Sequence, residues 1–98
     1  MSKAYLIARV TVTDPEAYKE YVARTPAAVA AAGGRFIVRG GEVTALEGPA
    51  EERRVVVIEF PSRAALEAFW TSDAYAAAKA FRKGAAIFEA VTVHGVPD

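Results

Sequence analysis

The chain has 98 residues, with twelve Lys and Arg against twelve Asp and Glu, one His and no Cys. This length corresponds to one domain, which we expect to span residues 1–98. Formal neutrality, with no segment of one sign, argues against a nucleic-acid partner, because such partners require concentrated positive charge. Without cysteine there is no disulfide framework and no thiolate nucleophile. No run approaches the roughly 20 apolar residues of a membrane span, and no signal-peptide pattern is present, so we expect a cytoplasmic protein without a membrane partner.

The first half of the chain predicts a strand followed by a helix. Apolar and polar residues alternate over 4–12, as in a half-buried strand. Asp14 is a good N-cap and Pro15 suits the first helical position. Pro26 lacks an amide hydrogen, so we expect the helix to kink there or to restart with Thr25 as its cap. Two consecutive glycines then end it.

The rest of the chain completes the pattern βαββαβ. A strand is expected over 35–39, followed by a turn or bulge at Gly40 and Gly41 and an extended piece to Glu47. Another strand is expected over 54–60, and a helix begins after Pro61 and breaks at Ser72 and Asp73. A second helical piece then runs to Gly84, and the last strand covers 86–94. This order predicts a ferredoxin-like α+β fold with sheet order 4-1-3-2 and both helical segments on one face. We expect the two middle strands to run parallel.

Both faces of the predicted sheet are apolar. The face toward the helices is expected to carry Leu6, Ala8, Val10, Phe36, Val38, Val56, Ile58 and Phe60. The opposite face is expected to carry Tyr5, Ile7, Ile37, Val55, Val57, Ile87, Val91 and Val93. Strands that are apolar on both sides are normally covered on both sides, and an uncovered patch of this size marks an interaction surface. We therefore predict a homodimer that forms through this second face.

Four charged residues also fall on the second face. In the predicted register Glu89, Arg9, Glu59 and Arg35 form one row of alternating sign across all four strands. A buried carboxylate without a partner would be costly or would take up a proton, so pairing is expected. The row is interpreted either as a structural salt-bridge row at the dimer interface or as the lining of a ligand or catalytic cavity.

Several motifs together resemble a known family. The segments "VTDPEAYKEY", "AAGGRFIVRGG", "LEG", "VVVIEFPS" and "YAAAKAFRKGA" resemble, in order and spacing, the bacterial family catalogued as domain of unknown function 1330. The resemblance covers nearly the whole chain and implies the dimeric α/β-barrel superfamily, in which two ferredoxin-like sheets pack through their open faces. That superfamily includes cofactor-independent monooxygenases, haem-degrading enzymes, lactone isomerases and ligand-sensing domains. The family has no assigned reaction.

The resemblance and the residues together give a set of candidate site residues. The family's pattern falls on Asp14, Tyr18, Tyr21, Gly33, Gly34, Arg39, Gly40, Glu47, Gly48, Glu59, Phe60, Pro61, Tyr75 and Arg82. The residues chosen as ligand-binding candidates are Tyr21, Arg39, Glu59, Trp70, Tyr75 and Arg82. Each has a structural alternative: the tyrosines and Trp70 as packed rings, and Arg82 as a favourable charge at a helix C-terminus.

Catalytic candidates are few. Glu59 or His94 is the possible general base, which would require a pKa near the working pH. A single His without neighbouring ligands predicts no metal site, and no phosphate loop or dinucleotide fingerprint appears, so no cofactor is expected.

Three functions therefore stand open. The first is a homodimeric small-molecule-binding domain, the second a cofactor-independent monooxygenase or isomerase acting on a small apolar or aromatic carbonyl compound, and the third a structural dimerisation module. A cavity of about 300 Å³ or more that meets several of the polar candidates would favour the first two. A filled interior would favour the third.

Overall fold

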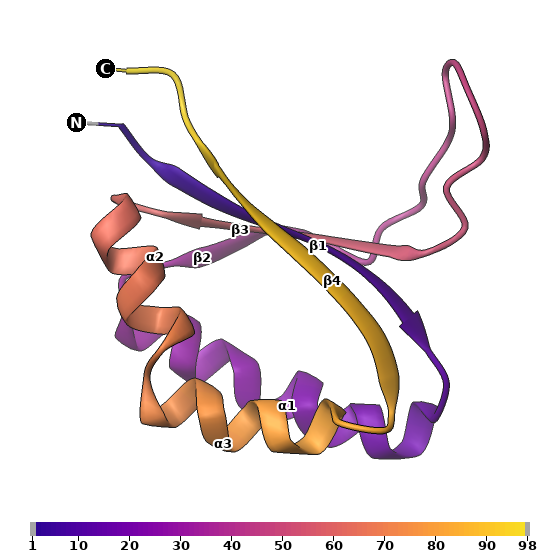
Figure 1. Ribbon diagram of the computed structural model, residues 1–98, viewed down its shortest axis with the longest axis horizontal. Helices are drawn as coiled ribbons and strands as arrows, with labels where there is room; N and C mark the ends of the chain where they lie inside the picture. Colours follow the sequence, from indigo (N-terminus) through magenta and orange to yellow (C-terminus); the bar gives the residue numbers. More distant parts are fainter. Residues whose placement is uncertain (1, 98) are drawn as a thin grey trace.

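The computed structural model describes residues 2–97 and contains a four-stranded sheet with three helices on one of its faces (Figure 1). The elements are β1 (Ala4–Val12), α1 (Pro15–Ala31), β2 (Arg35–Arg39), β3 (Arg54–Phe60), α2 (Arg63–Trp70), α3 (Asp73–Arg82) and β4 (Ala86–His94). The sheet order is β2-β3-β1-β4, which is the predicted order read from the other edge. The ferredoxin-like α+β fold predicted from the sequence is therefore confirmed.

The predicted direction of the two middle strands is wrong. β1 and β3 run antiparallel, with Tyr5 opposite Glu59 and Arg9 opposite Val55. The helical crossover makes β1 and β2 parallel, but the loop from β2 to β3 reverses the chain, and β3 inserts between them. The whole sheet is consequently antiparallel.

Helix α1 begins as predicted and passes through Pro26 without a break. The amide of Ala17 donates to the Asp14 side chain at 3.2 Å, which caps the first turn. The expected restart at Thr25 does not occur, because the Thr25 hydroxyl donates back to the carbonyl of Tyr21 inside the continuous helix. Pro26 still leaves the carbonyl of Val22 without its usual helical donor.

The second strand contains a bulge that the sequence did not reveal. The register against β3 shifts between Phe36 and Val38, so Ile37 is the extra residue. Val38 now lies opposite Val57 on the face away from the helices, whereas we expected it on the helix side. Arg39 lies opposite Val56 and is turned toward the helices.

The segment between β2 and β3 is a long loop. Residues 40–53 contain no strand, so the extended piece expected up to Glu47 does not pair with the sheet. Figure 1 shows this loop projecting past the sheet on the side away from the helices. Its Leu46 is 98% exposed.

The core lies between the helices and one face of the sheet. It is formed by Ala4, Leu6, Ala8, Val10, Tyr18, Tyr21, Ala28, Val29, Val56, Ile58, Phe60, Leu66, Phe69, Tyr75, Ala78 and Ala85. No helix covers the other face, which we call the open face; it carries Tyr5, Ile7, Ile37, Val38, Val55, Val57, Ile87, Val91 and Val93. Of these, Ile87 is 62% exposed and Val91 is 54% exposed.

Among residues 2–97, no helix has the length and hydropathy that a membrane crossing requires. The expected cytoplasmic location stays a prediction.

Candidate functional site

Two tyrosines that lie 54 residues apart in the chain meet in the interior. The hydroxyls of Tyr21 on α1 and Tyr75 on α3 are 2.9 Å apart and buried. Burial is the main cause that raises the pKa of Tyr21 far above its usual value, and the neighbouring Tyr75 adds to it. The Tyr21 hydroxyl therefore stays protonated. Because only one hydrogen is shared between the two hydroxyls, the other hydrogen is available to an acceptor.

This tyrosine pair borders a small cavity between α1 and the sheet, which we call the arginine–tyrosine cavity. It has a volume of about 30 Å³, more than the roughly 10–15 Å³ that one ordered water molecule needs. Its polar lining comes from Tyr18, Tyr21, Thr25, Arg39, Arg54 and Tyr75, and its apolar lining includes Phe36 and Phe88. The cavity thus brings together three of the predicted ligand residues, namely Tyr21, Arg39 and Tyr75.

Arg39 reaches this cavity because of the bulge in β2. Regular alternation would have put it on the open face, but the shifted register turns it toward α1. There its Nη2 donates to the carbonyl oxygen of Val22 at 2.8 Å, which is the acceptor that Pro26 leaves free. Its guanidinium also lies 4.3 Å from the centre of the Phe36 ring. Arg39 therefore has a structural role in addition to its place in the cavity lining.

Arg82 lies over Phe88 on the other side of the cavity. Its guanidinium carbon is 3.9 Å from the ring centre of Phe88 and 5.8 Å from that of Tyr21. The Nε of Arg82 and the Nε of Arg54 are both buried, and neither has a hydrogen-bond partner among the described residues.

A larger hollow lies between α2 and β4. This groove has a volume of about 280 Å³ and is lined by Leu6, Leu66, Glu67, Trp70, Thr71, Ala90, Val91 and Thr92. Trp70 is 36% exposed and its ring lies 5.1 Å from that of Tyr75. Leu6 lines both hollows. Size and polar character are therefore divided: the groove is nearly ligand-sized and mostly apolar, and the cavity is polar but small.

Glu59 lies on the open face, outside both hollows. Its carboxylate accepts from Arg35 Nε at 2.9 Å and from the Tyr5 hydroxyl at 3.2 Å, and Lys3 Nζ lies 3.7 Å away. These contacts, the Arg35 hydrogen bond first, lower the pKa of Glu59 below its ordinary value. Although its side chain is only 13% exposed, Glu59 is held as an anion, which makes it a poor general base near neutral pH.

The predicted row of four charges is wrong. Arg35 does lie opposite Glu59, and Arg9 does lie opposite Glu89. Because β1 and β3 are antiparallel, however, Arg9 faces Val55, and the two pairs occupy opposite ends of the open face.

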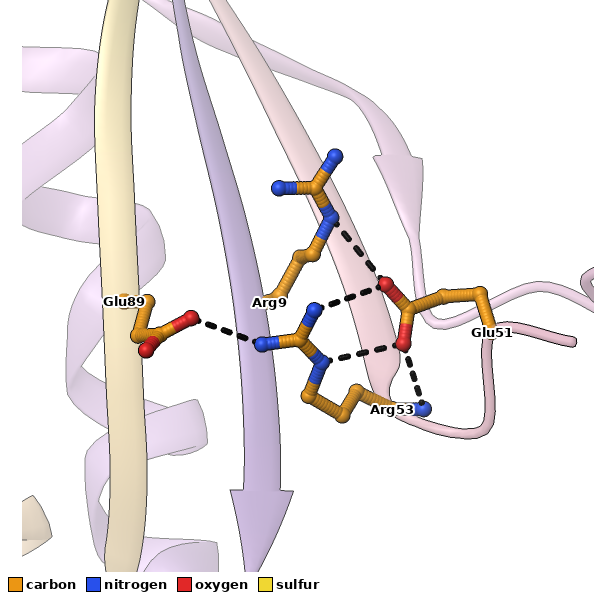
Figure 2. Close-up of polar contacts among 4 residues, drawn as sticks. All are labelled: Arg9, Glu51, Arg53 and Glu89. Carbon is orange, nitrogen blue, oxygen red and sulfur yellow. Dashed lines mark hydrogen bonds and ion pairs between the residues drawn. The ribbon is translucent and has the colours of Figure 1, made fainter. Parts of the chain in front are cut away.

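At the end of the open face where Arg9 lies, two residues that the sequence did not single out complete an ion-pair network (Figure 2). Glu51 accepts from Arg9 Nε at 3.1 Å and from Arg53 through two nitrogens at 2.9 and 3.0 Å. Arg53 also donates to Glu89 at 2.7 Å. The spacing of Glu51 and Arg53 at the end of a long loop gave no periodic signal, so only the folded register shows that they reach this face.

His94 is exposed at the end of β4. Its Nε2 lies 3.5 Å from Arg63 Nη1 on α2, and it contacts neither Glu59 nor the cavity. Within the described part of the chain, no three His, Cys, Asp or Glu side chains gather as metal ligands would. No carboxylate of residues 2–97 pairs with His94 to orient it as a general base.

Solved structures share this fold over nearly the whole chain. RPA0582, a protein of unknown function from Rhodopseudomonas palustris, is 21% identical with a TM-score of 0.77, covering 99% of this chain and 85% of its own. SnoaB, a cofactor-independent oxygenase from Streptomyces nogalater, is 15% identical with a TM-score of 0.63, covering 100% and 97%. A conserved protein of unknown function from Bacteroides thetaiotaomicron, described as a possible oxidoreductase, is 14% identical with a TM-score of 0.60, covering 95% and 97%.

These identities establish a common fold and no common reaction. Among curated proteins no match to the sequence is found. The sequence pattern of one family, described as "Domain of unknown function (DUF1330)", matches residues 3–96. The chain therefore belongs to this family.

Proposed function

We propose that the protein is a homodimeric domain that binds a small apolar molecule in the groove between α2 and β4. The observation that supports this most directly is the groove itself, about 280 Å³ of space lined mainly by Leu6, Leu66, Trp70 and residues of β4. Ligand sites are typically concave, largely apolar and about 300–1,000 Å³ in size. The groove is slightly smaller than that range, so it suits a ligand of one ring or a short chain.

The homodimer is proposed from the open face. Its apolar side chains cross all four strands, and Ile87 and Val91 keep more than half of their surface exposed in the single chain. Apolar patches of this extent mark interaction surfaces. The loop 40–53 projects on the same side (Figure 1) and contains the exposed Leu46, so it is placed to lie against a partner. A second copy is the occupant that matches both the patch and the loop.

Binding without turnover accounts best for the chemistry of the polar candidates. Glu59 is held anionic by Arg35, and the Tyr21 hydroxyl is held neutral by burial. Neither group has the pKa near neutrality that a general base requires.

Cofactor-independent oxygenation or isomerisation is the second candidate. The similarity to SnoaB in fold supports it, and so does the unshared hydroxyl hydrogen of the Tyr21–Tyr75 pair, which could hold a carbonyl oxygen. A purely structural dimerisation module is the third candidate, and it would leave the groove without a ligand. Oxygen uptake with candidate aromatic carbonyl compounds separates turnover from binding.

The groove can be tested through Trp70, the only tryptophan in the chain. Native mass spectrometry of the purified protein identifies any molecule that is carried along, and titration of that molecule should change the fluorescence of Trp70. Ala90→Phe fills the groove and should abolish both signals, whereas Ala68→Phe on the exposed side of α2 should leave them unchanged. A bare polypeptide mass, together with unchanged Trp70 fluorescence across a panel of small apolar compounds, would contradict the proposal.

A further inference from the structure

Arg39 and Arg54 line the arginine–tyrosine cavity, and Arg82 packs over Phe88 at its border; none of the three pairs with a carboxylate of residues 2–97. The ion pairs found within residues 2–97 engage other side chains and none of Arg39, Arg54 and Arg82. Elsewhere in the chain arginines form ion pairs, as Arg35 does with Glu59 and Arg24 with Glu20. The cavity is therefore a local exception to the charge pairing of the rest of the chain.

Arg54 and Arg82 approach Tyr18 from different elements. In the sheet Val10 lies opposite Arg54 of β3 on one side and opposite Phe88 of β4 on the other. Arg82 of α3 packs over Phe88. The charges of Arg54 and Arg82 both act to lower the pKa of Tyr18, against the burial that raises it.

A glycine makes room for Arg54. Gly40 has a φ of 72°, which suits glycine, and a Cβ at that position would collide with the Arg54 guanidinium. The Arg54 side chain therefore lies directly over the backbone next to Arg39. Arg39 and Arg54 both belong to the cavity lining.

The cavity and its border carry buried donors without a partner. Arg54 Nε in the lining and Arg82 Nε, which lies beside Phe88 at the border, have no partner in the described chain, and one hydroxyl hydrogen of the Tyr21–Tyr75 pair is unused. Buried donors without acceptors are unfavourable, and an unpaired buried charge is more so. An anion with several acceptor oxygens would supply the acceptors that these donors lack.

We propose that the arginine–tyrosine cavity binds the carboxylate group of a small organic acid. A volume of about 30 Å³ admits a compact head group and no ring. Because Arg39 is exposed and also lines the cavity, the cavity reaches the surface beside β2, and the body of the ligand stays outside against Phe36. Planar guanidinium groups match a planar carboxylate through paired hydrogen bonds. This site is separate from the groove, and the proposal does not depend on a ligand in the groove.

The direct test observes the arginine side chains by NMR of the full-length protein. Titration with benzoate should shift the Nε–Hε signals of Arg54 and Arg82 saturably. The signal of Arg24, which is paired with Glu20 and lies over Phe81, should not move. The neutral analogue benzamide should have no effect. Absence of a saturable shift, equal shifts with benzamide, or a response to phosphate but not to benzoate would each overturn the proposal.

Variants of Arg54 separate binding from a structural role. Arg54→Gln should weaken benzoate binding at least tenfold while leaving the melting temperature of the free protein equal or higher, because it removes an unpaired charge. Arg54→Lys keeps the charge but loses the planar guanidinium group. Its affinity for benzoate should lie between that of Arg54→Gln and that of the unmodified chain. Arg24→Gln is the matched control and should bind as the unmodified chain does. Loss of folding in Arg54→Gln would show that Arg54 is structural and would overturn the proposal.

The two proposals fail independently. Ala90→Phe, which fills the groove, should leave the benzoate response of Arg54 unchanged. If benzoate changes only the fluorescence of Trp70 and not the arginine signals, the carboxylate site is wrong and the groove stands.

Discussion

The contact between Arg39 and α1 gives a prediction with a defined sign and size. Pro26 has no amide hydrogen, so the Val22 carbonyl depends on Arg39 Nη2 at 2.8 Å. A hydrogen bond with a charged partner contributes about 1.5–3 kcal/mol, and the exposed position of Arg39 puts it at about 1.5 kcal/mol. The cation–π contact with Phe36 adds about 0.5 kcal/mol. Arg39→Gln should therefore lower the free energy of unfolding by about 2 kcal/mol in the unmodified chain.

Arg39→Gln should lower the free energy of unfolding much less once Pro26 is replaced. In Pro26→Ala the amide of residue 26 can donate to the Val22 carbonyl and complete the helical hydrogen bond. Arg39→Gln then loses only the contact with Phe36, about 0.5 kcal/mol. Pro26→Ala alone should stabilise the protein, because proline inside a helix is about 3 kcal/mol less favourable than alanine. About 1 kcal/mol of this gain is offset because proline restricts the unfolded chain.

A double-mutant cycle in urea, at one fixed protein concentration, measures this coupling. We expect a coupling of about 1.5 kcal/mol between positions 26 and 39. Equal costs of Arg39→Gln in both backgrounds would refute the reasoning and would show that Arg39 does not replace the missing donor.

Three further changes test the interior and the open face. Glu59→Gln should lower stability most at pH 7 and progressively less as the pH falls. A lowered carboxyl pKa stabilises the fold above the unfolded value of about 4.3, and this stabilisation is lost as the pH falls through the lowered value; urea titrations at pH 7 and at acidic pH measure it. Tyr21→Phe should cost about 1–3 kcal/mol because it removes the buried partner of the Tyr75 hydroxyl, and adding Tyr75→Phe should cost less than the sum, by thermal denaturation of the double variant. Gly40→Ala should destabilise by about 1–2 kcal/mol through its positive φ and should displace Arg54, which a changed Nε–Hε signal would reveal.

The sequence was sufficient for the elements and for the core, because both depend on periodicity. Alternation in residues 4–12 and 54–60, and the helical spacing of Tyr18, Tyr21 and Val29, placed these side chains on the correct face. Capping by Asp14 was likewise a local property and was confirmed.

Properties that depend on strand direction and register could not be predicted from the sequence alone. The antiparallel pairing of β1 and β3 separated Arg9 from Glu59, although each was assigned to the correct face. The bulge at Ile37 leaves no mark in the alternation, yet it decides that Arg39 meets α1 instead of the open face. The meeting of Tyr21 with Tyr75 arises from the packing of α1 on α3, which no local pattern encodes.

The central claim is that the sheet is covered by helices on one face and by a second copy of the chain on the other. Sedimentation equilibrium at micromolar concentration measures it most directly. We predict a molar mass of twice the 10.4 kDa of the chain. A mass of a single chain, under conditions where the protein is folded, would contradict the account.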